Sequence, residues 1–231
     1  GLESAKYIGE NSLATKVAVI YDSSDPYSVG IYEAFRAEAA NQNIEIVSDA
    51  AFTADNKTDF STAVQGAKNA GAELLYMPFY YTEASLVLAE CNKQSYKPLF
   101  FGVDGMDGIL SVENFDASLA EDLMYMAPFV AGSDDEMVKS FVTKYQEKYN
   151  EVPNQFAGDA YDCVYVVKAA MEEAGVTADM DASAICDALK TAMTSITFDG
   201  ITGKGISWEA SGEPNKAPLI VQIKGGEGVA L

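Results

Sequence analysis

Short apolar runs that alternate with helical patterns constrain the fold of this chain more than any other feature. The first 105 residues contain four such runs: KVAVIYD (16–22), IEIVSDAAF (44–52), ELLYMPF (73–79) and KPLFFGVDG (97–105). Helices are expected over 3–13, along Ile31, Phe35 and Ala39, over 58–71 and over 82–95. This alternation, at a spacing of roughly 25 to 30 residues, is typical of βαβ units. It predicts an α/β fold with a doubly wound parallel sheet and helices on both faces.

The second half of the chain follows a different pattern. After residue 122, the run LMYMAPFV predicts one more extended segment. Helices are then expected from Asp134 or Asp135, with Met137, Phe141 and Tyr145 along one face, from Asn154, and over 181–193. In the tail, two alternating runs flank a region rich in Gly, Pro and Asn, which predicts an irregular hairpin.

Charge and the missing histidine exclude several classes of function. The chain has 35 acidic and 15 basic side chains, a formal net charge of -20 and no cluster of lysine or arginine. Such a polyanion is repelled by nucleic acid and by anionic lipid surfaces, so we expect no nucleic-acid partner. The absence of histidine excludes Ser-His-Asp and Cys-His catalysis and histidine metal sites within this chain. Carboxylate-based chemistry stays open.

No metal or cofactor is expected. Cys91, Cys163 and Cys186 lie far apart without CxxC spacing, which is neither a zinc pattern nor an even-numbered disulfide framework. Buried or inert thiols are the simplest interpretation. The stretch DGMDG lacks the third ligand and the terminal glutamate of a calcium loop. Neither GxGxxG nor GxxxxGK followed by Ser or Thr occurs, so nucleotide binding has little support.

The apolar content suits a folded domain rather than a membrane span. Hydrophobic residues make up 48 % of the 231 residues, enough to bury one or two cores. The longest apolar stretches, such as residues 74–81, are far too short to cross a bilayer. No signal peptide or lipid-attachment sequence is visible at Gly1, so we expect a cytosolic chain or a mature or trimmed form of an exported protein.

Aromatic and acidic residues stand at the carboxyl ends of the expected strands. In an open parallel sheet, ligands bind beyond these ends, where the strand order reverses. With the strand order 2-1-3-4, Tyr27 and Tyr80 face each other across the crevice and Asp104 lies beside them. Each residue also has a simpler interpretation, because a strand-end tyrosine can cover the core and Asp104 can be a turn residue before Gly105.

Two aromatic rings around one carboxylate suit a small cationic or zwitterionic ligand. The carboxylate accepts a charge-assisted hydrogen bond from an ammonium group, and the rings exclude water and add cation–π attraction. Such a site needs no general base, and no pair of acids with separate roles is evident in the sequence. The pattern therefore favours ligand recognition, and we do not expect an enzyme.

The chain also resembles a known family over nearly its whole length. The matching stretches occur in the family's order: AKYIGE, KVAVIYDSSDPYSVGIYEAFR, TDFSTAV, YMPFYYTEA, LFFGVDG, FVTKYQEKYNEVPNQFAGDAYDCV, FDGITGKGISW and PLIVQIKGG. They are similar to solute-binding proteins of the branched-chain amino acid (Leu/Ile/Val) class. These proteins serve ABC importers and share the type I periplasmic binding protein fold.

The resemblance implies roles for four residues. Asp104 matches the acidic position that binds the α-amino group of the ligand, where family members often have glutamate. Tyr27 and Tyr80 match the aromatic positions that close over the ligand. Phe156, in NQFAGDAYD, matches an apolar contact from the other lobe. The implied partners are an amino acid and the ABC permease subunits in the membrane, and the implied location is extracytoplasmic.

The resemblance covers the second two-thirds of the family's length. The strands, helices and Ser/Thr loops with which the family's first lobe begins, and which bind the ligand carboxylate, have no counterpart here. Residues 1–126 then form the second lobe with its parallel sheet. Residues 127–217 form part of the first lobe, helices and a hairpin lacking the N-terminal sheet, and residues 218–231 return to the second lobe. A missing N-terminal lobe is therefore an expected partner, and exposed apolar faces should promote association.

Two other functions stay open. A ligand-sensing domain of a receptor or regulator with the same fold would bind the same sort of ligand and signal instead of transporting it. A carboxylate-dependent hydrolase is a third interpretation, from the enzyme class. The identity of the bound amino acid also stays open, because side-chain selectivity lies largely in the lobe that has no counterpart here.

Overall fold

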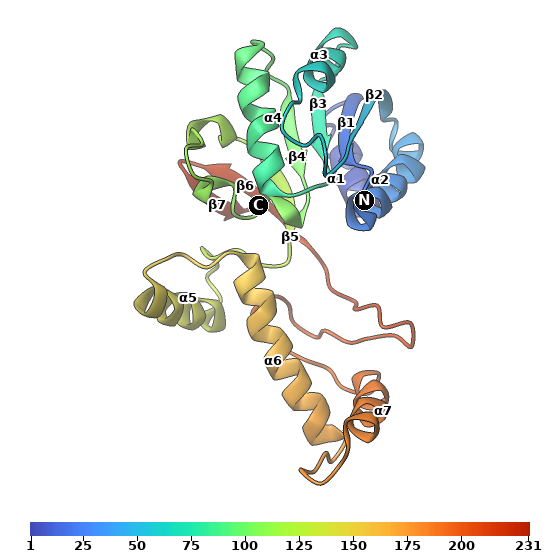
Figure 1. Cartoon of the computed structure of the whole chain (residues 1–231), viewed down its shortest axis with the longest axis vertical. Helices are drawn as coiled ribbons and strands as arrows, with labels where there is room; N and C mark the ends of the chain where they lie inside the picture. The colour runs from blue at the N-terminus through green and yellow to red at the C-terminus, as the bar shows by residue number, and fades with distance from the viewer. The chain divides into compact units, whose positions relative to one another are not determined.

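The structure is a computed structural model that describes residues 1–231. It divides into two compact units, whose elements are labelled in Figure 1. The first unit contains residues 1–127, 220–229 and 231, and the second contains residues 128–219 and 230. None of the helices combines the length and apolarity needed to cross a membrane.

A seven-stranded sheet with the order β2-β1-β3-β4-β5-β6-β7 forms the centre of the first unit. Its strands are β1 (Lys16–Asp22), β2 (Glu45–Phe52), β3 (Leu74–Met77), β4 (Leu99–Gly102), β5 (Met124–Ala127), β6 (Leu219–Lys224) and β7 (Glu227–Ala230). β1 pairs in parallel with β2 and β3, β3 with β4, and β4 with β5. The expected order 2-1-3-4 is confirmed, and the chain reverses direction across the sheet between β1 and β3.

Four helices accompany this sheet: α1 (Leu2–Glu10), α2 (Pro26–Ala39), α3 (Ser61–Asn69) and α4 (Tyr81–Lys93). Short 3-10 turns follow at η1 (Ala40–Gln42), η2 (Asp104–Met106), η3 (Ile109–Ser111) and η4 (Ala117–Ala120). α3 begins three residues later than expected, because residues 53–60 form a connecting loop and the Asp59 carboxylate accepts a hydrogen bond from Ser61 N at 2.9 Å. Asp25 begins α2 as a cap, and its carboxylate accepts from Tyr27 N at 3.0 Å.

Aromatic side chains dominate the core between the sheet and the pair α1 and α2. Phe35 of α2 stacks on Tyr76 of β3 with ring centroids 4.1 Å apart, and Phe101 of β4 lies 6.3 Å beyond Tyr76. Ile8 of α1 and Val19 of β1 belong to the same fully buried cluster. Because strand side chains alternate between faces, Ile20, Leu75 and Met77 lie on the opposite face.

The second unit is mainly helical and has a small core. Its helices are α5 (Glu136–Tyr149), α6 (Gln155–Glu173) and α7 (Ala182–Met193), capped by Asp135, Asn154 and Asp181. The core cluster is formed by Phe129, Val138, Phe141 and Ile201. The buried Asp162 carboxylate of α6 accepts hydrogen bonds from the loop after α7: from Ile201 N (3.1 Å), Thr202 N (2.8 Å) and Thr202 Oγ1 (2.7 Å).

Two details of the sequence prediction for this half are wrong. The tail forms no single hairpin: Phe198 bridges Ile206, Trp208 bridges Pro214, and the run LIVQIK enters the large sheet as β6. Its alternate residues Val221 and Ile223 are fully buried there, which stabilises that placement. In α5, Met137 does not share the buried face of Phe141, since 46 % of its surface is exposed and Val138 occupies the core position.

Candidate functional site

The carboxyl ends of β1, β3 and β4 bring together three of the four residues singled out from the sequence. Tyr27 lies in the first turn of α2 after β1, Tyr80 caps α4 after β3, and Asp104 begins η2 after β4. All three lie within the first unit. This edge of the sheet is where an open parallel fold places its ligand.

The hydroxyl of Tyr27 links α2 to the loop that follows β4. It donates a hydrogen bond to Asp104 Oδ1 at 2.5 Å and accepts one from Gly105 N at 3.1 Å. Burial, together with the charge and hydrogen bond of Asp104, raises the pKa of Tyr27 far above its ordinary value. Tyr27 is therefore a neutral donor that fixes the orientation of the Asp104 carboxylate.

Gly105 permits this close approach. A Cβ atom at this position would lie 2.7 Å from the carbonyl oxygen of Phe79 and 3.1 Å from the Tyr27 hydroxyl. Both distances are shorter than ordinary van der Waals contacts, so a larger residue would push the loop away from β3 and from Tyr27. The glycine after Asp104 thus has a structural reason, and the Asp-Gly pair was its only signal in the sequence.

Tyr80 lies directly against Tyr27. The two rings are stacked with centroids 5.1 Å apart and an angle of 23° between their planes, within the usual range for aromatic pairs. The prediction of two rings facing each other across an open crevice is therefore wrong in detail, because nothing fits between them. Tyr80 keeps 41 % of its surface exposed. Burial, followed by the charges of Asp25 and Asp104, raises the pKa of Tyr80.

Tyr81, next to Tyr80, and the fourth predicted residue, Phe156, have other positions. Tyr81 begins α4, and its ring lies against Gly108, where an added Cβ would be 3.0 Å from the ring. Phe156 belongs to α6 in the second unit, with 39 % of its surface exposed. A contact of Phe156 with the ligand stays a prediction.

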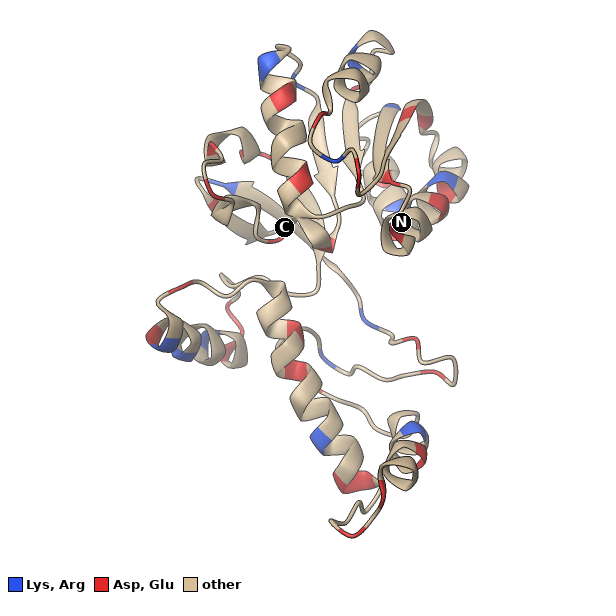
Figure 2. Cartoon of the chain, viewed as in Figure 1, with Lys and Arg blue, Asp and Glu red and all other residues tan.

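Charges and thiols suggest no other reaction centre. No group of three or more His, Cys, Asp or Glu side chains is arranged to hold a metal ion. Cys91 is buried, and burial raises its thiol pKa to about 12, whereas Cys163 and Cys186 are exposed rather than buried. Acidic residues are spread over the elements of both units, with basic residues interspersed among them (Figure 2).

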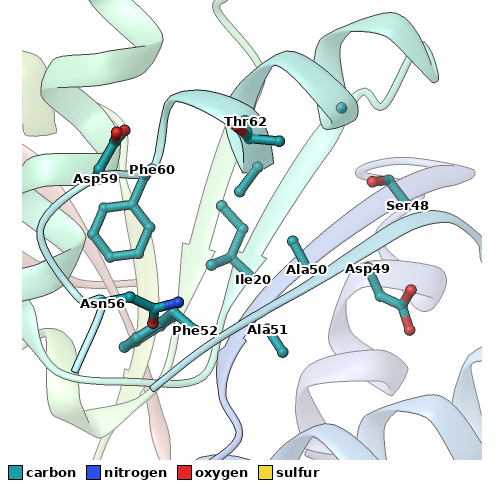
Figure 3. A pocket seen from close by; sticks show the side chains of 12 residues that line it. Ile20, Ser48, Asp49, Ala50, Ala51, Phe52, Asn56, Asp59, Phe60 and Thr62 are labelled. Carbon is teal, nitrogen blue, oxygen red and sulfur yellow. The ribbon is translucent and has the colours of Figure 1, made fainter. Parts of the chain in front are cut away.

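A cavity that the sequence did not predict lies between β2 and α3. Its volume is about 420 Å³, and small residues such as Ser48, Ala50 and Gly66 line it together with Phe52 and Phe60 (Figure 3). A second cavity of about 390 Å³ lies beside Cys91, at the end of α4 and the start of β4. The residues of neither cavity include Tyr27, Tyr80 or Asp104.

Comparison with known proteins gives the family. A family model described as periplasmic binding protein matches residues 3–227, almost the whole chain. The chain belongs to the periplasmic binding protein family. Its seven-stranded sheet agrees with the type I fold expected from the sequence.

Individual members of this family support the assignment. The chain is 28 % identical over 204 residues to a Leu/Ile/Val-binding protein homolog of Brucella melitensis, an alignment that covers 84 % of this chain and 52 % of the relative. A leucine-binding protein LivK from Thermotoga maritima has the same fold, with a TM-score of 0.86 and 22 % identity. The match covers 100 % of this chain and 63 % of the LivK chain.

A structure with a bound ligand is among the similar proteins. The branched-chain amino acid transporter substrate-binding protein LivJ from Streptococcus pneumoniae, in complex with isoleucine, matches with a TM-score of 0.81 and 27 % identity. The match covers 98 % of this chain and 63 % of LivJ. The chain thus spans about half the length of the curated relatives and less than two-thirds of these solved structures.

Proposed function

We propose that this chain is part of the extracytoplasmic solute-binding component of an ABC importer. The component binds an amino acid, branched-chain or related, between two lobes and delivers it to the membrane permease. The observation that carries the proposal is the hydrogen bond from the Tyr27 hydroxyl to Asp104 Oδ1, with the ring of Tyr80 stacked on that of Tyr27. The relatives named above, which include Leu/Ile/Val-binding homologs and LivJ with isoleucine, support an amino acid as the ligand.

Asp104 is the proposed acceptor for the α-ammonium group. A carboxylate oriented by a neutral hydroxyl donor forms a short, charge-assisted hydrogen bond with an ammonium group, which is stronger than a neutral one. Because Tyr27 and Tyr80 stack on each other, the ammonium lies at the edge of the ring pair, beside Asp104, rather than between the rings. The arrangement contains no histidine base, and its chemistry is recognition.

The two units correspond, in this proposal, to parts of two lobes. The first unit is the second lobe, and residues 127–217 are the part of the first lobe that contributes Phe156. Loops of a preceding lobe bind the ligand carboxylate, and closure of the lobes shifts an open-closed population toward the form that the permease recognises. Micromolar binding corresponds to roughly 8 kcal/mol, which one ammonium contact, one carboxylate site and a buried side chain can supply.

Calorimetry tests the proposal. We compare a polypeptide that joins a complete first lobe to these residues with the present chain alone, using a panel of amino acids. The longer protein should bind leucine, isoleucine or valine, and the present chain should bind weakly or not at all. Asp104→Ala in the longer protein should abolish binding. Unchanged affinity of Asp104→Ala rejects the assigned role, and tight binding by the present chain rejects the two-lobe site.

A further inference from the structure

The loop formed by residues 53–60, between β2 and α3, is bonded to both segments that carry the stacked tyrosines. On one side, Ala54 N donates a hydrogen bond to Ser24 Oγ at 3.1 Å, three residues before Tyr27. On the other side, Lys57 Nζ lies 2.9 Å from Glu83 Oε1, three residues after Tyr80. We refer to these residues as the 53–60 loop.

The attachment to the Tyr27 side is made by hydrogen bonds close to the sheet. Ser23 donates to the carbonyl oxygen of Phe52 from its backbone N (2.9 Å) and from its hydroxyl (3.0 Å). The Ser24 hydroxyl that accepts from Ala54 N itself donates to Asp22 Oδ1 at 2.6 Å. The start of the 53–60 loop is therefore fixed to the segment that leads into α2.

One ion pair attaches the 53–60 loop to the first turn of α4. Glu83 lies in the first turn of α4, and only 12 % of its side chain is exposed, against 48 % for Lys57. The carboxylate of Glu83, and to a lesser degree that of Asp22, raises the pKa of Lys57. An ion pair with one largely buried partner contributes more than a fully exposed pair, because removal of Lys57 leaves a poorly solvated charge.

Aromatic contacts connect the same loop to the strand end beneath Tyr80. Phe60 contacts Phe52 edge to face at 5.2 Å, and Phe52 contacts Phe79 in the same way at 5.1 Å. Figure 3 shows Phe52 and Phe60 side by side at one end of the cavity between β2 and α3. Phe79 directly precedes Tyr80. The 53–60 loop therefore contacts the Tyr80 segment in two ways, through the Phe60–Phe52–Phe79 ring contacts and through the Lys57–Glu83 ion pair.

We propose that the Lys57–Glu83 ion pair is a positioning element of the ligand site. It holds the first turn of α4, and with it the Tyr80 ring, in register with Tyr27 and Asp104. This inference rests on the proposed amino-acid site. Lys57 does not need to touch the ligand, and its effect is transmitted through Glu83 and the helix end.

The direction in which ligand affinity changes when Lys57 is removed distinguishes a positioning role from a direct electrostatic one. Lys57 is a cation on the same strand-end edge as Asp104, so loss of its charge alone would favour an approaching ammonium group. Loss of position has the opposite result, since a displaced Tyr80 ring weakens the contact with the ligand. Weaker binding after removal of Lys57 therefore reports the position of the ring.

The experiment uses calorimetry with leucine, isoleucine and valine on the longer, two-lobed protein. Lys57→Met should weaken binding about threefold to fivefold, the size expected for one ion pair. The exchanged pair Lys57→Glu with Glu83→Lys should recover most of this loss. Lys93→Met is the matched control, because it removes the Lys93–Glu90 pair (3.0 Å) from the last turn of the same helix and should leave affinity unchanged.

Amide hydrogen exchange gives a second measurement that needs no ligand. The backbone N of Ala84 donates to the carbonyl of Tyr80 at 3.2 Å and reports the first turn of α4. In Lys57→Met, this amide should exchange at least threefold faster, with recovery in the exchanged pair.

The outcomes distinguish this inference from the proposed function. If the unmodified protein binds none of the amino acids, the proposed function fails, and the Ala84 amide alone decides whether the ion pair holds the helix end. If the unmodified protein binds and Lys57→Met binds equally or more tightly, the positioning role is overturned and the proposed function stands. Weaker binding without recovery in the exchanged pair also overturns it.

Discussion

Tyr27 and Asp104, which are 77 positions apart in sequence, are joined by a 2.5 Å hydrogen bond in which the tyrosine hydroxyl is the donor. The same hydroxyl accepts from Gly105 N, so one side chain orients both the carboxylate and the backbone that follows it. This contact joins two separate strand ends at the proposed recognition site.

Tyr27→Phe tests the contact directly. The ring can still stack on Tyr80, but Asp104 loses the hydrogen bond from Tyr27, and Gly105 N loses its acceptor. Amino-acid affinity should therefore fall about tenfold, or about 1.4 kcal/mol. The matched control is Tyr32→Phe, which removes a similar bond to Asp49 Oδ2 (2.7 Å) on the edge strand. Calorimetry on the two-lobed protein should show a loss for Tyr27→Phe alone. Equal affinities in the two variants contradict the role of Tyr27.

Tyr76→Phe should stabilise the fold. The Tyr76 hydroxyl is fully buried near Ser4, whose hydroxyl donates to Met126 Sδ at 3.6 Å, so no hydrogen bond of good geometry satisfies Tyr76. Its ring stack on Phe35 does not depend on the hydroxyl. Removing a buried unsatisfied group should raise the free energy of unfolding by about 1 kcal/mol. Tyr96→Phe, which loses a 2.8 Å bond to the carbonyl of Ala72, should lower it by a similar amount. Urea unfolding of both variants measures these opposite changes in the free energy of unfolding. A lower free energy of unfolding in Tyr76→Phe would contradict the prediction.

Alkaline pH should destabilise the first unit. Burial raises the pKa values of Tyr27, Tyr76 and Tyr125 above the ordinary value near 10. A raised folded-state pKa gives stability that is fully present below the unfolded pKa and is lost as pH rises above it, by about 1.4 kcal/mol per pH unit for each group. Urea unfolding should give a lower free energy of unfolding at about pH 11 than at about pH 9. This decrease should be smaller by about 1 kcal/mol in Tyr76→Phe. If the free energy of unfolding of Tyr76→Phe depends on pH as that of the unmodified protein does, the raised pKa of Tyr76 is contradicted.

Much of this arrangement was predictable from the sequence. The runs KVAVIYD and ELLYMPF are apolar enough to be buried strands, and parallel strands end at one edge, so Tyr27, Tyr80 and Asp104 had to lie near each other. The direct stacking of the rings was not predictable, because it depends on side-chain rotamers and on the space left by Gly105. The family resemblance predicted that residues 218–231 return to the second lobe. The pairing of Leu219–Lys224 beside β5 was not predictable from local turn patterns, because its partner lies about a hundred residues away.

The apolar surface of α6 should promote association of the present chain. Val164, Val167 and Met171 expose 68 %, 47 % and 37 % of their surface, and they recur at helical spacing. Light scattering should show a mass above that of the monomer, which rises with concentration. Val164→Lys should reduce association, although the added positive charge weakens the repulsion between the negatively charged copies. Val229→Lys, at an exposed valine of β7, should not reduce it. A strict monomer at high concentration contradicts the prediction.

The most direct test of an ammonium site at Asp104 compares a branched-chain amino acid with the same molecule without its amino group. On the two-lobed protein, calorimetry should show binding of leucine at about micromolar Kd and at least about a hundredfold weaker binding of 4-methylpentanoate. In Asp104→Asn this preference should largely disappear, because the neutral amide lacks the charge that favours the ammonium. Equal affinity of the unmodified protein for both compounds would contradict the account.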